Sequence, residues 1–201
     1  NRKEAVAALH RAQIMTAAEK LFSEKGYEQT TIEDISKESE YSRRTIYAYY
    51  ESKDDILHCI IEKGLQALKT DIENAANDNA GFTDAYRAVC RAHSLERLNC
   101  AGDEEIGRTV KSAAVKNILR LGTEINETLE ALIIRGQESG EVRKDIVPTL
   151  TVYVLWSSID SLLALAGTKG KFICAQNGMT EEKFLDYGFR QIVNSILEAR
   201  I

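Results

Sequence analysis

Apolar residues recur along most of the chain at intervals of three and four positions, which is the period of an amphipathic helix. The first clear stripe is formed by Ile14, Ala17, Ala18, Leu21 and Phe22. Long helices are predicted at 7–25, 53–72, 82–98, 114–139, 148–166 and from 180 onward. No segment alternates apolar and polar residues as a strand would, and no internal repeat is found. The pattern therefore predicts an all-α chain.

Capping residues and turn formers mark where the predicted helices begin and end. Gly26 is placed to end the first helix as a C-terminal cap. Thr31, with Asp34 three residues later, fits a helix start in which the hydroxyl and the carboxylate satisfy free backbone N–H groups. Pro148, the only proline, fits the first turn of a helix. Further starts are predicted at Ser42, Ser52, Asp103 and Thr180, and loops at 74–81, 140–147 and 167–178.

The segment 30–53 packs two short helices and a tight turn in front of a new helix start. The residues able to hold the two helices together are Ile32, Ile35, Ile46 and Tyr50. This layout is that of a helix-turn-helix, whose second helix enters the DNA major groove and presents its N-terminal side chains to base edges. In this chain those side chains are Arg43, Arg44 and Thr45.

The same segment resembles the TetR family of transcriptional regulators. The matching residues are Ala17, Ala18, Leu21, Phe22, Gly26, Tyr27, Thr30, Thr31, Ile35, Ser42, Thr45, Ile46, Tyr47, Tyr49, Tyr50, Ser52 and Lys53. The chain departs from the family pattern at the turn, where Glu40 and Tyr41 replace a common Gly and a small apolar residue. The resemblance implies a three-helix DNA-binding head over 1–52 and a larger helical effector-binding and dimerisation domain over 53–201.

Each residue of the head has an expected role. Arg43 and Arg44 can each donate two parallel hydrogen bonds to a guanine, although a contact to phosphate alone is equally open for either. The resemblance implies phosphate contacts for Tyr47 and Tyr49 and a phosphate anchor at Lys53. The predicted DNA-binding residues are Thr31, Ser42, Arg43, Arg44, Thr45, Tyr47, Tyr49 and Lys53.

Composition narrows the class of protein. With 201 residues, a net charge of −5 and a pI near 5.4, the chain does not bind nucleic acid by bulk charge, so any DNA contact is local. Its four cysteines lack CxxC spacing, and its histidines offer only one pair with metal-ligand spacing, His93 with Glu96, which is weak without a second pair. We therefore expect a reduced cytoplasmic protein with no catalytic site, metal or cofactor. An enzyme and a helical protein-interaction module are the alternatives to a DNA-binding regulator.

The helix predicted at 148–166 is apolar around most of its circumference and therefore needs cover on two sides. Because serines and Asp160 interrupt it, we expect a buried helix rather than a membrane span. We expect it to pair, together with the last helix, with a second copy as a four-helix bundle; a self-contained monomer is the alternative. The predicted interface residues are Leu155, Ile159, Leu162, Phe189, Ile192, Val193 and Ile196.

A small-molecule effector is implied mainly by the resemblance, which gives repression with effector-triggered release as the usual mode of action. Aromatic walls with a few polar groups suit a small, mostly apolar ligand. The candidate lining residues are Tyr86, Cys90, His93, Tyr153 and Trp156, for each of which a plain core role is equally open.

Overall fold

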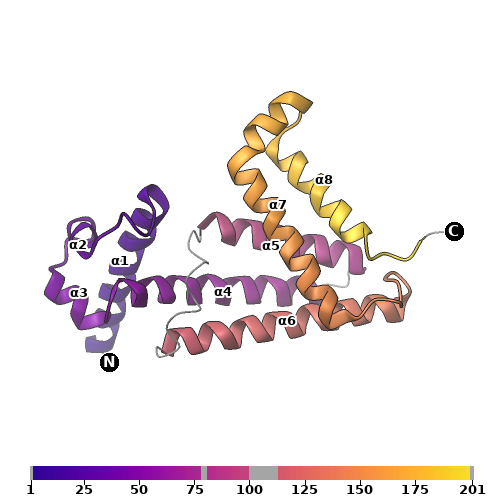
Figure 1. The fold of residues 1–201 in the computed structure, drawn as a ribbon. Coiled ribbons are helices and arrows are strands. Elements are labelled where there is room, and N and C mark those ends of the chain that lie inside the picture. The colour runs from indigo at the N-terminus through magenta and orange to yellow at the C-terminus, as the bar shows by residue number, and fades with distance from the viewer. Residues whose placement is uncertain (1, 78–80, 100–112, 200–201) are drawn as a thin grey trace. The chain divides into compact units, whose positions relative to one another are not determined.

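The computed structural model describes residues 2–77, 81–99 and 113–199 (Figure 1). These residues form eight helices: α1 (Arg2–Lys25), α2 (Ile32–Ser39), α3 (Arg43–Tyr49), α4 (Lys53–Asn77), α5 (Phe82–Asn99), α6 (Ala113–Ser139), α7 (Pro148–Asn177) and α8 (Glu181–Asn194). Within the described ranges the only β pairing is one isolated bridge between Val142 and Leu197. The all-α prediction is confirmed, whereas the helix start predicted at Asp103 lies outside the described residues.

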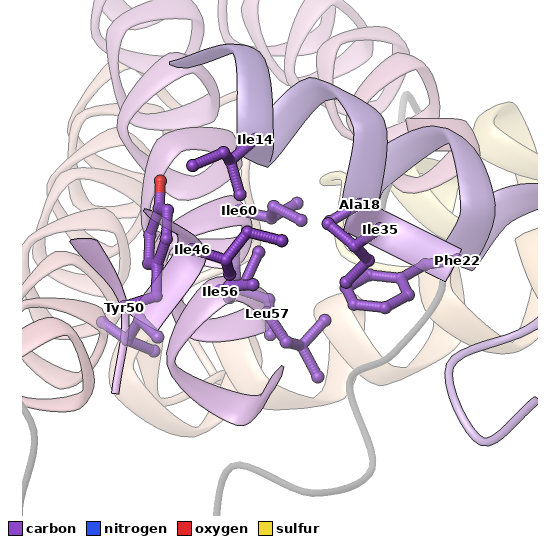
Figure 2. Close-up of a cluster of buried hydrophobic side chains, with 11 residues drawn as sticks. Ile14, Ala18, Phe22, Ile35, Ile46, Tyr50, Ile56, Leu57 and Ile60 are labelled. Atoms are coloured by element: carbon purple, nitrogen blue, oxygen red, sulfur yellow. The ribbon is translucent and has the colours of Figure 1, made fainter. Parts of the chain in front are cut away.

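The chain divides into two compact units, residues 1–67 with 96–122 and residues 68–95 with 123–201. The first unit contains the predicted head, and its core is shown in Figure 2. That core brings together Ile14, Ala18 and Phe22 of α1, Ile35 of α2, Ile46 of α3, Tyr50, and Ile56, Leu57 and Ile60 of α4. The stripes predicted from the sequence thus meet around a single apolar centre, which fixes the helix-turn-helix against α1 and α4.

In the second unit, α7 and α8 lie side by side. Leu155 and Ile159 of α7 and Phe189 and Val193 of α8 are buried. The two helices approach closely at Gly188, where an added Cβ would overlap the side chain of Leu162.

The loop predicted at 74–81 begins later than the sequence indicated, because α4 continues to Asn77. Ala76 is buried, and its carbonyl accepts a hydrogen bond from the Arg135 guanidinium of α6. Asparagine lowers helix propensity only modestly, so this tertiary contact decides the conformation of the last turn.

The loop predicted at 167–178 is wrong, since α7 continues through it to Asn177. A glycine inside a helix costs only about 1 kcal/mol relative to alanine, so Gly167 and Gly170 do not by themselves end one. Gly170 is buried, and the side chain of Glu181 at the start of α8 lies next to it. The helix ends where Gly178 adopts a left-handed conformation, with φ of 62°.

Candidate nucleic-acid interface

The start of α2 is fixed by a reciprocal cap, as predicted. The Thr31 hydroxyl accepts a hydrogen bond from the Asp34 backbone N–H at 3.2 Å, and the Asp34 carboxylate accepts one from the Thr31 backbone N–H at 2.8 Å. The Lys25 ammonium lies 2.8 Å from the same carboxylate. This ion pair, followed by the bonds from Thr31, holds the pKa of Asp34 well below its usual range.

The turn between α2 and α3 contains the departure from the family pattern. Glu40 adopts the left-handed conformation with φ of 59°, and it is the one residue other than glycine with positive φ in the described part of the chain. For a residue other than glycine, the left-handed backbone conformation costs of order 1–3 kcal/mol of folding free energy. The Ser36 hydroxyl holds the turn by donating to the Tyr41 carbonyl at 2.6 Å. The chain therefore forms a tight turn between α2 and α3 although Glu40, and not a glycine, holds the left-handed position.

The second helix, α3, separates a buried face from an exposed one. Ser42 caps it by accepting a hydrogen bond from the Thr45 backbone N–H at 3.1 Å. On the inner face Ile46 is fully buried, and the hydroxyl of buried Tyr50 donates to the Arg11 carbonyl at 2.9 Å. This anchoring leaves the opposite face of α3 free to contact a partner.

Four of the predicted DNA-binding residues are exposed at this face or its start, namely Ser42, Arg43, Arg44 and Tyr47, while Thr45 is half-buried. The Arg43 guanidinium lies 3.5 Å from the Glu33 carboxylate of α2. Arg44 forms no hydrogen bond or ion pair with the described residues. Tyr47 is 55% exposed, an unusual state for a large aromatic side chain. Arginine and tyrosine in this position are suited to contact bases and phosphates.

Lys53, predicted as a phosphate anchor, has structural partners. Its ammonium donates to the carbonyls of Tyr27 at 2.9 Å and Thr30 at 3.1 Å, and it lies 3.9 Å from the centre of the Tyr27 ring. The neighbouring Asp54 accepts a hydrogen bond from the Tyr27 hydroxyl. We call these contacts the α4 clamp: they tie the first two residues of α4, Lys53 and Asp54, to the loop between α1 and α2.

The contacts of Tyr49 and Tyr41 with α1 could not be predicted from sequence spacing. Tyr49 is half-buried, and its hydroxyl lies 3.0 Å from Nδ1 of His10 in α1. The Tyr41 hydroxyl donates to the Gln13 side chain, also in α1. These partners are 39 and 28 residues apart in the chain, so no helical spacing connects them.

The predicted effector-binding residues belong to the second unit, and the structure brings four of the five into its interior. Tyr86, Cys90 and His93 are buried on one face of α5. The His93 ring lies 4.2 Å from the ring of half-buried Trp156, measured between centroids, and its Nε2 lies 2.7 Å from the Asp160 carboxylate. By contrast, Tyr153 is 59% exposed and so does not join them.

Two polar atoms of this cluster are buried without a partner. The Tyr86 hydroxyl and Nδ1 of His93 have no hydrogen bond within the described part of the chain. Burial raises the pKa of the Tyr86 hydroxyl, and it raises that of the Cys90 thiol to about 12, so both stay protonated at neutral pH. Buried polar groups without partners are rare in folded proteins.

The seven predicted interface residues lie mainly inside the chain. Leu155, Ile159, Phe189, Val193 and Ile196 are buried, while Leu162 and Ile192 are half-buried. The exposed apolar side chains of α7 are different ones. They form what we call the α7 stripe: Leu150, Val154, Leu165 and Phe172, with Tyr153 beside them. Intervals of 4, 11 and 7 residues place the four stripe residues on one side of the helix.

Among the helices in the described ranges, α7 alone is long and apolar enough to cross a membrane. A single helix of this kind is weak evidence for a membrane span, because the core helix of a soluble protein can have the same length and composition. Its apolar character divides between the buried contacts with α8 and the exposed α7 stripe. An apolar stripe of this kind on a water-exposed helix is typical of a surface that another protein covers.

A helix-turn-helix with a capped, outward-facing second helix defines a DNA-binding regulator, and the comparisons identify which kind. Residues 14–60 match the family model described as bacterial regulatory proteins, tetR family. The relatives that the chain resembles are named as regulators, several of them as transcriptional regulators of the helix-turn-helix type. Over residues 14–60 the chain therefore matches the TetR family, and its fold as a whole is similar to that of solved TetR-family regulators.

Similarity to individual proteins extends beyond the head. The chain is 26% identical to the fatty acid metabolism regulator protein of Bacillus subtilis over 156 residues, covering 74% of this chain and 78% of that protein. It is 39% identical to the regulator HbdR of an Aromatoleum species over 82 residues, 41% of this chain and 34% of that one. The fold matches that of the Bacillus subtilis regulator FadR in complex with stearoyl-CoA, with a TM-score of 0.71 and 19% identity over 92% of this chain and 98% of that one.

Proposed function

We propose that the chain is a homodimeric transcriptional repressor that binds a pseudo-palindromic DNA operator and is released from it by a small-molecule effector. The observation that carries the proposal is α3, whose inner face is buried at Ile46 while Arg43, Arg44 and Tyr47 face outward. The match to the TetR family supports the same function. A repressor of this kind acts in the cytoplasm, where the DNA lies.

Arg44 is the stronger candidate for reading a base, because Arg43 is already paired with Glu33. Selection of bound duplexes from a random pool tests DNA binding and the palindrome together. Arg44→Ala should cost roughly 1–3 kcal/mol on the selected site and relax the preference at one base pair. Recovery of no consensus by the wild type would favour a protein-interaction module instead, and unchanged preference in Arg44→Ala would remove its base-reading role.

We propose that a second copy covers the α7 stripe. A dimer presents two α3 helices to half-sites about 34–36 Å apart, one turn of DNA. From Leu150 to Phe172 the stripe spans 22 residue steps, which is about 33 Å of helix at 1.5 Å per step. Burial of the stripe would remove four exposed apolar side chains of α7 from water.

Sedimentation velocity at micromolar concentration tests the dimer. The wild type should sediment as a dimer, and Val154→Glu, within the stripe, should sediment as a monomer with unchanged helix content. Ala131→Glu places the same charge on an exposed position of α6 and should leave the dimer intact. A monomeric wild type would contradict the dimer, and a dimeric Val154→Glu would place the interface elsewhere.

The effector site we propose is the cluster of Tyr86, Cys90, His93 and Trp156, which combines apolar walls with two unpartnered polar atoms. The relative FadR holds stearoyl-CoA, so this acyl thioester is the first probe to test. The chain has a single tryptophan, Trp156, which lies in the cluster and reports on it by fluorescence. A saturable change in emission together with release of the operator supports the proposal. If neither is seen, stearoyl-CoA is not the effector.

A further inference from the structure

The first unit contains a cleft of about 640 Å³ at the C-terminal end of α3. Its walls come from α1, from the end of α3, from the first part of α4 and from the start of α6. Tyr47, which the proposed function places against DNA, forms part of one wall. We propose that this cleft binds an organic ammonium ion that carries N–H groups, such as a linear polyamine.

A buried histidine is the first observation that points to a ligand. His58 lines the cleft and is only 6% exposed. It forms no hydrogen bond or ion pair with any described residue. The ring nitrogens of His58 are not among the fully buried, unpartnered atoms of the described residues, so they stay open to the cleft, where a ligand can replace water as their partner. A neutral imidazole has one nitrogen that accepts a hydrogen bond, and an ammonium N–H inside the cleft would supply the donor.

The charges on the walls select a cation. Four carboxylates line the cleft, those of Glu51, Asp54, Asp55 and Glu62, against one guanidinium, that of Arg11. Glu62 accepts a hydrogen bond from the Asn117 side chain at 2.7 Å and Asp55 accepts one from the Glu51 backbone N–H at 3.0 Å, which leaves further acceptor positions on each carboxylate. Low-dielectric walls with an excess of one charge concentrate ions of the opposite charge.

The thiol of Cys59, on the same wall, responds to this environment. Burial, followed by the carboxylates of Asp55 and Glu62, raises its pKa to about 11. The thiol therefore stays neutral at physiological pH and adds no further negative charge to the cleft.

The aromatic part of the wall already holds one cation. The Arg11 guanidinium lies 5.7 Å from the centre of the Tyr50 ring, within the range of a cation–π contact. Tyr47 and Tyr49 add two further rings to the lining. A volume of about 640 Å³ lies within the range of about 300–1,000 Å³ that small-molecule sites usually occupy.

Calorimetric titration of spermidine into the full chain, without DNA and at about 150 mM salt, tests the site directly. The wild type should bind one spermidine per chain. Glu62→Gln keeps the shape of the side chain but removes its charge, so it should weaken binding about tenfold or more. Glu51→Gln removes a charge from an exposed position of the wall and should also weaken spermidine binding. The matched control Glu127→Gln, exposed on α6 and outside the cleft, should leave the affinity unchanged.

Three results would overturn the proposal. They are the absence of saturable heat in the wild type, an equal loss in Glu127→Gln, and equally tight binding of benzyltrimethylammonium, which has no N–H group to donate. The cleft lies in a different unit from the Tyr86 cluster, and the measurement uses no DNA. Failure here therefore leaves the proposed repressor function untouched.

Discussion

Removal of the Lys53 ammonium is expected to destabilise the head. In the α4 clamp this group donates to two backbone carbonyls, of Tyr27 and Thr30, and lies on the Tyr27 ring. Hydrogen bonds to a charged group are each worth about 1.5–3 kcal/mol when buried, and Lys53 is only half-buried. We therefore expect Lys53→Met, which keeps the length of the side chain, to lose about 2–3 kcal/mol of unfolding free energy.

Urea denaturation followed by helical circular dichroism measures this loss as a lower midpoint. Lys116→Met is the matched control, since Lys116 is exposed on α6 in the same unit and no contact is described for it. Lys53→Arg should fall between Lys53→Met and the wild type, because a guanidinium keeps the charge but not the geometry. Equal midpoints for Lys53→Met and Lys116→Met would refute the clamp as a source of stability.

The same variant also bears on DNA binding. If Lys53 anchors a phosphate as the family resemblance implies, Lys53→Met should weaken binding to every sequence alike and lower the salt slope by about one unit. Fluorescence anisotropy of a labelled duplex at several salt concentrations separates the two roles. A lower urea midpoint with an unchanged salt slope would leave Lys53 a structural role alone.

Further predictions concern α6 and acid stability. Gly136→Ala would place a Cβ 2.5 Å from Val142 and 2.9 Å from the Phe82 ring and should lose roughly 1–3 kcal/mol, whereas Gly122→Ala, in open space on the same helix, should gain about 0.5–1 kcal/mol. Thermal denaturation ranks the two, and the opposite order would contradict the packing. Because the folded pKa of Asp34 is lowered, its stabilising effect is complete above its ordinary value of 3.8 and is lost as the pH falls below it. Asp34→Asn should remove this part of the acid transition, and identical acid titrations would refute it.

The head was predictable because its defining contacts are local. The caps that start α2, α3 and α4 join residues three positions apart, Thr31 with Asp34, Ser42 with Thr45 and Ser52 with Asp55. Short spacings of this kind are directly visible in a sequence. The bond between His93 and Asp160 spans 67 residues and had no such signal, although His93 itself was a candidate.

The faces of α7 show why the predicted interface residues differ from the apolar residues that a single chain leaves exposed. Helical periodicity identifies which residues share a side, but it does not say which side the chain covers itself. Leu155 and Ile159 face α8 and are buried, so the apolar side chains left in water are those of the α7 stripe. The same ambiguity affects Tyr153, which was expected beside Trp156 but is exposed instead.

The α4 clamp also limits how a signal can reach DNA. Lys53 and Asp54 are consecutive on α4 and therefore point about 100° apart around its axis, yet both bind the loop between α1 and α2. Because Lys53 and Asp54 hold the loop from two sides of the helix, this end of α4 can rotate or slide against the loop only if the hydrogen bonds of both residues break. A movement that arrives along α4 is thus expected to carry the whole reading head as a rigid body, so that α3 is displaced while its own conformation stays intact.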